Sequence, residues 1–211
     1  MMIAITMGDA NGVGPEIILK AFRDGEIPGQ CVVVGDYQVL RHCGEMIGID
    51  VPLHPITSLE EYQPGVVNVW DRGLLSPEDI TPGKRSQKVG AASRDYVAFA
   101  AQKTLEGVFD AVVTLPVNKE AIRLSDPGFT GHTELIADIC GQKEYTMMLS
   151  SSKLTVTHVS THVSMLEAVR NVQKDRTVMV ARLTHEGLVG KVVRPRSAVA
   201  GHNAHAGEGG A

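Results

Sequence analysis

The stretch that decides the fold stands at the start of the chain, where residues 2–16 read MIAITMGDANGVGPE. Met2–Met7 is an apolar run one strand long, and the glycines after it let the backbone turn tightly. Pro15 suits the first position of a helix, because its missing N–H would have no partner there, and Glu16 complements the helix dipole. A strand, a Gly-rich turn and a helix over Pro15–Phe22 predict the first unit of an α/β protein.

Short apolar runs alternate with amphipathic stretches along the rest of the chain, which is typical of the α/β class. The further strands that we expect are Cys31–Gly35, Val66–Asp71, Asp110–Pro116, Thr146–Ser150 and Leu154–His158 as a hairpin, and Ala198–Gly201. The further helices that we expect run from Asp36, as the capping residue, to Gly44 or Gly48, and over Ser86–Glu106, Thr133–Cys140, Met165–Val172 and Asp175–Glu186.

Composition excludes several classes of protein. The chain has 211 residues, of which 43% are hydrophobic and 21% charged, as in a globular protein. A formal net charge of −4 without a basic cluster disfavours nucleic-acid binding. No apolar run approaches the ~20 residues of a membrane-spanning helix, and the three cysteines are widely spaced, as reduced thiols are. We therefore expect a cytoplasmic protein.

Two segments with polar side chains follow expected strands, where open α/β sheets bind ligands. The first is the Gly-rich loop with Asp9, which either contacts a ligand or only connects the strand tightly to its helix. The second contains Asn118 and Lys119. Its alternative interpretation is an ordinary helix start, with Asn118 as the N-cap and Lys119 in solvent.

Histidines provide the remaining candidates. His132 and Thr133 follow Gly131 and offer a donor–acceptor pair for a carboxylate or hydroxyl, although either could instead cap a helix. His162 and His205 each follow an expected strand, and two imidazoles can converge on one metal ion. Two histidines are fewer than the three protein ligands usual in a catalytic site, and a lone loop histidine is more often solvated.

Five motifs occur in one order: Met-Gly-Asp-x-x-Gly-Val-Gly-Pro-Glu, Pro-Val-Asn-Lys-Glu-Ala, Gly-His-Thr-Glu, Thr-His before a short helix, and Asn-x-His-Ala-Gly-Glu-Gly-Gly. Together they resemble the 4-hydroxythreonine-4-phosphate dehydrogenase family of pyridoxal phosphate (vitamin B6) biosynthesis, and the match runs from Met2 to Gly210. Ala10 and Asn11 depart from the more usual Pro-Ala of that family.

The resemblance implies an α/β/α sandwich with a mixed, largely parallel sheet, similar to isocitrate and isopropylmalate dehydrogenases, in a homodimer. It implies that His132 and Thr133 bind substrate and that His162 and His205 bind a divalent metal (Zn, Mg or Co). The cofactor would be NAD or NADP. The implied reaction oxidises 4-phosphohydroxy-L-threonine to a β-keto acid, which decarboxylates to 3-amino-2-oxopropyl phosphate.

The family's third metal histidine and its phosphate-binding residues lie in a segment C-terminal to the position of Ala211. We therefore expect residues 1–211 to be the N-terminal and central part of a two-domain dehydrogenase, with the second domain incomplete. Related enzymes act on D-threonate or D-erythronate 4-phosphate, or on an aromatic cis-dihydrodiol carboxylate, and these substrates stay open. A truncated remnant without catalytic activity is a further alternative.

Overall fold

The computed structural model describes residues 1–27 and 30–201. The chain divides into two compact units, Met1–Gly141 and a second unit that begins at Gln142, and each is considered by itself.

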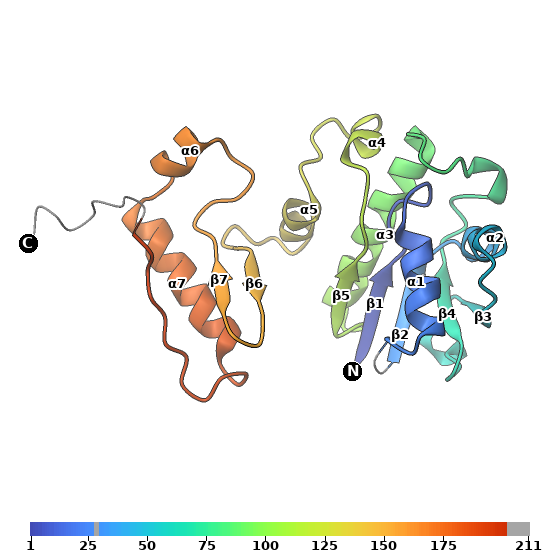
Figure 1. Ribbon diagram of the computed structural model, residues 1–211, viewed down its shortest axis with the longest axis horizontal. Helices are drawn as coiled ribbons and strands as arrows, with labels where there is room; N and C mark the ends of the chain where they lie inside the picture. The colour runs from blue at the N-terminus through green and yellow to red at the C-terminus, as the bar shows by residue number, and fades with distance from the viewer. Residues whose placement is uncertain (28–29, 202–211) are drawn as a thin grey trace, which may run out of the picture. The chain divides into compact units, whose positions relative to one another are not determined.

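The first unit is built on a five-stranded sheet (Figure 1). The strands are β1 (Met2–Thr6), β2 (Gln30–Gly35), β3 (Leu53–Ile56), β4 (Val67–Asp71) and β5 (Ala111–Thr114), in the spatial order β3-β4-β2-β1-β5. Every neighbouring pair is parallel, and Ala4 in β1 lies opposite both Val32 and Val112. We expected a mixed, largely parallel sheet, and the sheet of this unit is parallel throughout.

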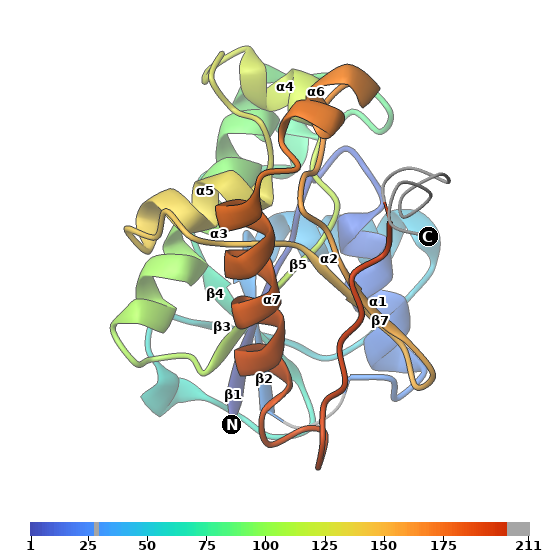
Figure 2. The same cartoon turned by 90° about the vertical axis from the view of Figure 1, so that its left-hand side faces the viewer.

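Helices cover both faces of this sheet. Helices α1 (Gly14–Arg23) and α2 (Tyr37–Ile47) contact each other on one face, and α3 (Gln87–Leu105) packs against β1, β2 and β5 on the other (Figures 1 and 2). The central strands therefore bury both sides, which explains their continuous apolar runs. The predicted α/β class is confirmed.

Most of the expected elements are present with ends that differ by a few residues, but one expected strand is absent and one strand of the sheet was not predicted. No strand forms over residues 198–201, where the apolar side chain of Val199 is 75% exposed. The edge strand β3 was missed, because Pro55 interrupts its pattern. Proline is tolerated on an edge strand, where its missing N–H needs no partner.

A close contact between two helices seats the segment that follows β5. A Cβ on Gly90 in α3 would lie 2.4 Å from the carbonyl oxygen of Ala121 in α4 (Lys119–Arg123). Only glycine leaves room for this approach. Helix α4 is thereby held against α3, and its first residues are placed just after the end of β5.

The second unit contains the hairpin of β6 (Met148–Ser150) and β7 (Thr155–Thr157), which are antiparallel as predicted. It also contains α6 (Met165–Arg170) and α7 (Lys174–Leu188). The hydroxyls of Thr157 and Thr184 are hydrogen-bonded at 2.8 Å and connect the hairpin to α7. None of the helices over the described residues is both long enough and apolar enough to span a bilayer.

Candidate functional site

The chain leaves two neighbouring strands toward opposite faces of the sheet. β1 continues into α1 on one face, whereas β5 continues into α4, which packs on α3 at the other face. Parallel strands whose connections diverge in this way leave a crevice beyond their carboxyl ends, where α/β proteins bind ligands. We call this side of the sheet, where the strands end, the carboxyl edge.

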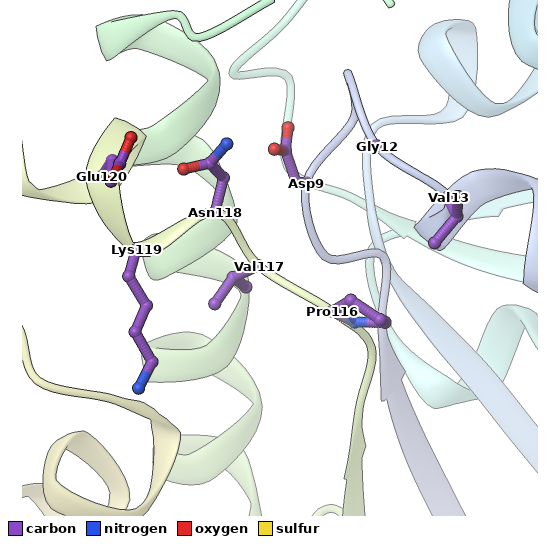
Figure 3. A pocket seen from close by; sticks show the side chains of 8 residues that line it. All are labelled: Asp9, Gly12, Val13, Pro116, Val117, Asn118, Lys119 and Glu120. Carbon is purple, nitrogen blue, oxygen red and sulfur yellow. The ribbon is translucent and has the colours of Figure 1, made fainter. Parts of the chain in front are cut away.

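A pocket of about 430 Å³ lies in this crevice. Its lining residues come from the loop after β1, from the loop after β5 and from the first turn of α4. They are Asp9, Gly12, Val13, Pro116, Val117, Asn118, Lys119 and Glu120 (Figure 3). The three residues that were predicted to lie in ligand loops, Asp9, Asn118 and Lys119, are thus brought together in one pocket.

Gly8 allows the two loops to approach each other closely, and Gly14 allows the tight connection from β1 to α1. Gly8 has φ of 73°, and a Cβ there would lie 2.5 Å from the carbonyl oxygen of Pro116. A Cβ on Gly14 would lie 2.1 Å from the carbonyl oxygen of Met7. The amide of Asp9 donates to the Pro116 carbonyl at 2.9 Å. The tight strand–helix connection is therefore confirmed, and the same backbone forms one wall of the pocket.

Asn11, which departs from the usual family motif, has a structural role that the sequence did not reveal. Its buried side chain accepts the amide of Thr81 at 2.7 Å and donates to the carbonyl of Lys84 at 3.0 Å. Its own carbonyl accepts the amide of Gly83 at 2.8 Å. Asn11 thereby attaches the loop 81–84 to the Gly-rich loop.

Asp36 was expected to cap α2, and this was wrong in one respect. It occupies the N-cap position, but its side chain makes no capping bond. The buried carboxylate instead accepts the amides of Leu74 at 2.8 Å and Leu75 at 2.9 Å and the hydroxyl of Tyr96 at 2.5 Å. Asp36 and Asn11 thus hold the two ends of the segment 74–84 at the carboxyl edge.

Asp9 places a carboxylate in the wall of the pocket. Asp9 is 7% exposed, and its Oδ1 accepts a hydrogen bond from the amide of Asn11 at 2.9 Å. Burial raises the pKa of Asp9, and the hydrogen bond from Asn11 lowers it by a smaller amount. Figure 3 shows the Asp9 side chain on the loop that faces Asn118.

Asp9→Asn is expected to stabilise the protein at pH 8 and to change its stability little at pH 4. The raised pKa means that the folded state holds its proton to higher pH than the unfolded state does, so wild-type stability falls as pH rises through the folded pKa. The amide keeps an acceptor for Asn11 and carries no charge. Thermal melts of both proteins from pH 4 to 8 measure the difference, and an equal difference at all pH values would contradict this origin.

Asn118 caps α4, since its side chain accepts the amide of Ala121 at 3.0 Å. This confirms the helix-start interpretation for Asn118, although the residue also lines the pocket. Lys119 is half-buried instead of lying in solvent. Its side chain leaves the crevice and extends toward α5 (His132–Ile139), as Figure 3 shows.

His132 and Thr133 form the first turn of α5, and neither caps it. The capping residue is Gly131, which has no side chain to make a bond. The Nε2 atom of His132 is buried and has no hydrogen-bond partner within residues 1–27 and 30–201. Burial, and secondly the charge of Lys119, lower the pKa of His132 and favour the neutral imidazole. A buried donor or acceptor without a partner is uncommon in folded proteins.

Only one of the two predicted metal ligands, His162, lies among the described residues. His162 is exposed in the second unit with φ of 57°, a left-handed conformation that is uncommon outside glycine. His205 lies outside the described residues. Within the described ranges, no group of three or more His, Cys, Asp and Glu side chains could hold a metal ion.

Comparison with known proteins gives one consistent result. The chain is 38% identical to a D-threonate 4-phosphate dehydrogenase of Cupriavidus necator over 99% of this chain and 64% of the relative. It is 35% identical to a 4-hydroxythreonine-4-phosphate dehydrogenase of Beijerinckia indica over 99% of this chain and 62% of the relative. The chain thus spans less than two thirds of the length of these relatives.

A solved structure of a 4-hydroxythreonine-4-phosphate dehydrogenase from Klebsiella pneumoniae is similar with a TM-score of 0.90 and 37% identity, over 99% of this chain and 65% of that one. The family model described as pyridoxal phosphate biosynthetic protein PdxA matches residues 28–211. The sequence and the parallel α/β fold thus agree, and the chain belongs to the PdxA family.

Proposed function

We propose that the protein is an NAD(P)-linked dehydrogenase that oxidises the secondary hydroxyl of a phosphorylated four-carbon hydroxy acid. The observation that carries this proposal is the pocket at the carboxyl edge, where motif residues Asp9, Asn118 and Lys119 meet. Membership of the PdxA family supports it, because the relatives compared above are named as dehydrogenases of such acids.

The reaction removes a hydride from C3 of the substrate and the proton of the C3 hydroxyl. When bound, NAD or NADP accepts the hydride. The product is a β-keto acid, which loses carbon dioxide as the C1–C2 bond breaks and C2 takes a proton. 4-Phosphohydroxy-L-threonine would give 3-amino-2-oxopropyl phosphate, and D-threonate 4-phosphate would give dihydroxyacetone phosphate.

The side chains at the start of α5 would orient the substrate. His132 offers a neutral imidazole whose Nε2 lacks a partner among the described residues and would donate a hydrogen bond to a substrate oxygen. Thr133 adds a hydroxyl in the same helical turn. Positioning of this kind can supply a large share of a rate enhancement, because the reacting groups no longer search for the productive geometry.

Two substrates remain candidates, and a specific observation favours testing both. The relative from Cupriavidus necator, named for D-threonate 4-phosphate, is 38% identical to the chain, and the relative from Beijerinckia indica, named for 4-hydroxythreonine 4-phosphate, is 35% identical. The two compounds share the phosphate, the carboxylate and the C3 hydroxyl and differ in bearing a hydroxyl or an amine at C2.

The test is NADH or NADPH formation at 340 nm by the intact protein with each substrate, with added Zn, Mg or Co, followed by identification of the product. We expect one substrate to be turned over, with dihydroxyacetone phosphate or 3-amino-2-oxopropyl phosphate appearing in equal amount. Absence of turnover with both substrates and both dinucleotides would contradict the proposal.

We also propose that His162 and His205 are two ligands of a divalent metal. A strained left-handed residue costs about 1–3 kcal/mol and is retained most often at functional sites, and His162 has that conformation. Imidazole is a common ligand of Zn and Co.

His162→Asn is expected to weaken metal binding by about 10-fold or more, since it removes a direct ligand. Asparagine also tolerates the left-handed conformation, so the melting temperature without metal should stay within a few degrees of wild type. Calorimetric titration of the metal-free proteins with Zn measures this directly. Equal affinities in the two proteins would exclude His162 as a ligand.

We further propose that the protein forms a homodimer through the hairpin of the second unit. Leu149, Leu154 and Val156 are 57%, 66% and 42% exposed on this hairpin. A cluster of exposed apolar side chains on neighbouring strands commonly marks a protein–protein contact. Light scattering after size exclusion would give twice the chain mass, and a monomer at micromolar concentration would contradict the proposal.

A further inference from the structure

The Lys119 ammonium lies beside the start of α5. A Cβ on Gly131 would lie 3.5 Å from Nζ of Lys119 and 3.8 Å from its Cε. These are ordinary van der Waals distances, so the end of the Lys119 side chain lies directly against the backbone at Gly131. Over the part of the chain that the structure describes, no salt bridge or hydrogen bond holds this ammonium group. Its positive charge thus remains available to a ligand.

His132 follows Gly131 directly and carries the buried Nε2 that lacks a partner among the described residues. Among charged groups, Lys119 is the one that acts on the pKa of His132, and it lowers that pKa in addition to the larger effect of burial. The ammonium and the imidazole are therefore near neighbours, although they come from α4 and α5. Together they offer one positive charge and one neutral hydrogen-bonding nitrogen.

We propose that Lys119 and His132 form the subsite for the substrate's carboxylate, in which Lys119 supplies the charge and His132 Nε2–H donates a hydrogen bond. This inference rests on the proposed function. The N-terminus of α5 adds a partial positive charge at the same place. Lys119 would thus be a specificity-determining residue, which favours acids over the corresponding alcohols.

The charge at this subsite fits a carboxylate better than a phosphate. A phosphate monoester carries about two negative charges at neutral pH, whereas this subsite has one ammonium. Glu134 adds a negative group, because its Oε2 would lie 3.0 Å from the same Gly131 Cβ. A neighbouring carboxylate disfavours a dianion more than a monoanion.

The experiment compares two ligands that differ only at C1: D-threonate 4-phosphate, and D-threitol 4-phosphate, which has a CH₂OH group in place of the carboxylate. Calorimetry measures their dissociation constants for intact wild-type protein and Lys119→Met. We expect Lys119→Met to weaken the acid by about 10- to 100-fold, the range for a lost charge-assisted hydrogen bond. The dissociation constants of the alcohol for the two proteins should differ by less than about threefold. Lys119→Arg, which keeps the charge, should recover part of the loss.

Lys20→Met is the matched control, since it removes the same charge from an exposed site on α1. It should change neither affinity. An equal loss for acid and alcohol in Lys119→Met would assign Lys119 to the phosphate and overturn the proposal, as would no loss for either. If 4-phosphohydroxy-L-threonine is the substrate turned over, its amino alcohol replaces D-threitol 4-phosphate.

A second measurement is independent of turnover. The pKa of His132, followed by NMR of the imidazole, should rise in Lys119→Met toward its ordinary value and remain below it because of burial. An unchanged pKa would refute the proximity of the two groups. Wild-type protein that neither binds nor oxidises the acid would refute the proposed function itself. Normal wild-type turnover with unchanged acid affinity in Lys119→Met would refute only the role of Lys119.

Discussion

His132→Ala is expected to lower kcat/KM for the phosphorylated hydroxy acid by about 100- to 1000-fold, the range for removing a positioned hydrogen-bonding group from an active site. The imidazole Nε2 is buried without a partner inside the described protein, so the partner that it lacks would be supplied by the substrate. Steady-state kinetics, followed as NADH or NADPH formation at 340 nm with the substrate that wild-type protein oxidises, measures the loss.

The fold should tolerate this substitution, because the His132 side chain makes no capping bond to α5. We expect the melting temperature to fall by a few degrees at most. His132→Gln, which keeps a donor, should recover part of the activity. A kcat/KM within threefold of wild type in His132→Ala would remove His132 from the site.

Asp36→Ala is expected to lower the free energy of unfolding by about 3–5 kcal/mol, as does removal of one partner from a buried charged network. Three donors would lose their acceptor: the amides of Leu74 and Leu75 and the hydroxyl of Tyr96. Tyr96 is fully buried, so no water could replace the carboxylate without rearrangement. Urea unfolding monitored by circular dichroism measures the change.

Tyr96→Phe is the matched comparison. It removes one donor and leaves the two amides bonded to Asp36, so we expect a cost of about 1–2 kcal/mol. Hydrogen exchange should show faster opening of the segment 74–84 in Asp36→Ala than in Tyr96→Phe. A cost below about 1 kcal/mol for Asp36→Ala would show that the carboxylate does not hold this segment.

The part of the fold that sequence could predict is the part set by local chemistry. The unit from β1 to α1 follows from an apolar run, three glycines and Pro15, all within 15 residues of one another. The position of the pocket also followed, because the carboxyl ends of parallel strands meet on one side of a sheet. Asp9, Asn118 and Lys119 could therefore be selected before the structure was known.

The missed features depend on partners far away in the chain. Asp36 bonds to residues 38, 39 and 60 positions away, so it looked like the cap of the adjacent helix. Asn11 bonds to residues 70 and 73 positions away. The approach of Lys119 to His132 depends on the packing of α4 against Gly90 of α3. No local pattern encodes such contacts.

The most direct test of the substrate site is the ¹⁵N resonance of His132 Nε2, recorded while the phosphorylated hydroxy acid is titrated into protein labelled at histidine and assigned with His132→Gln. The nitrogen has no partner among the described residues, so an arriving carboxylate should shift its resonance strongly and with saturation. We expect the midpoint of that shift to agree with the calorimetric dissociation constant. A resonance that stays in place at saturating substrate would contradict a substrate site at the carboxyl edge beside α5.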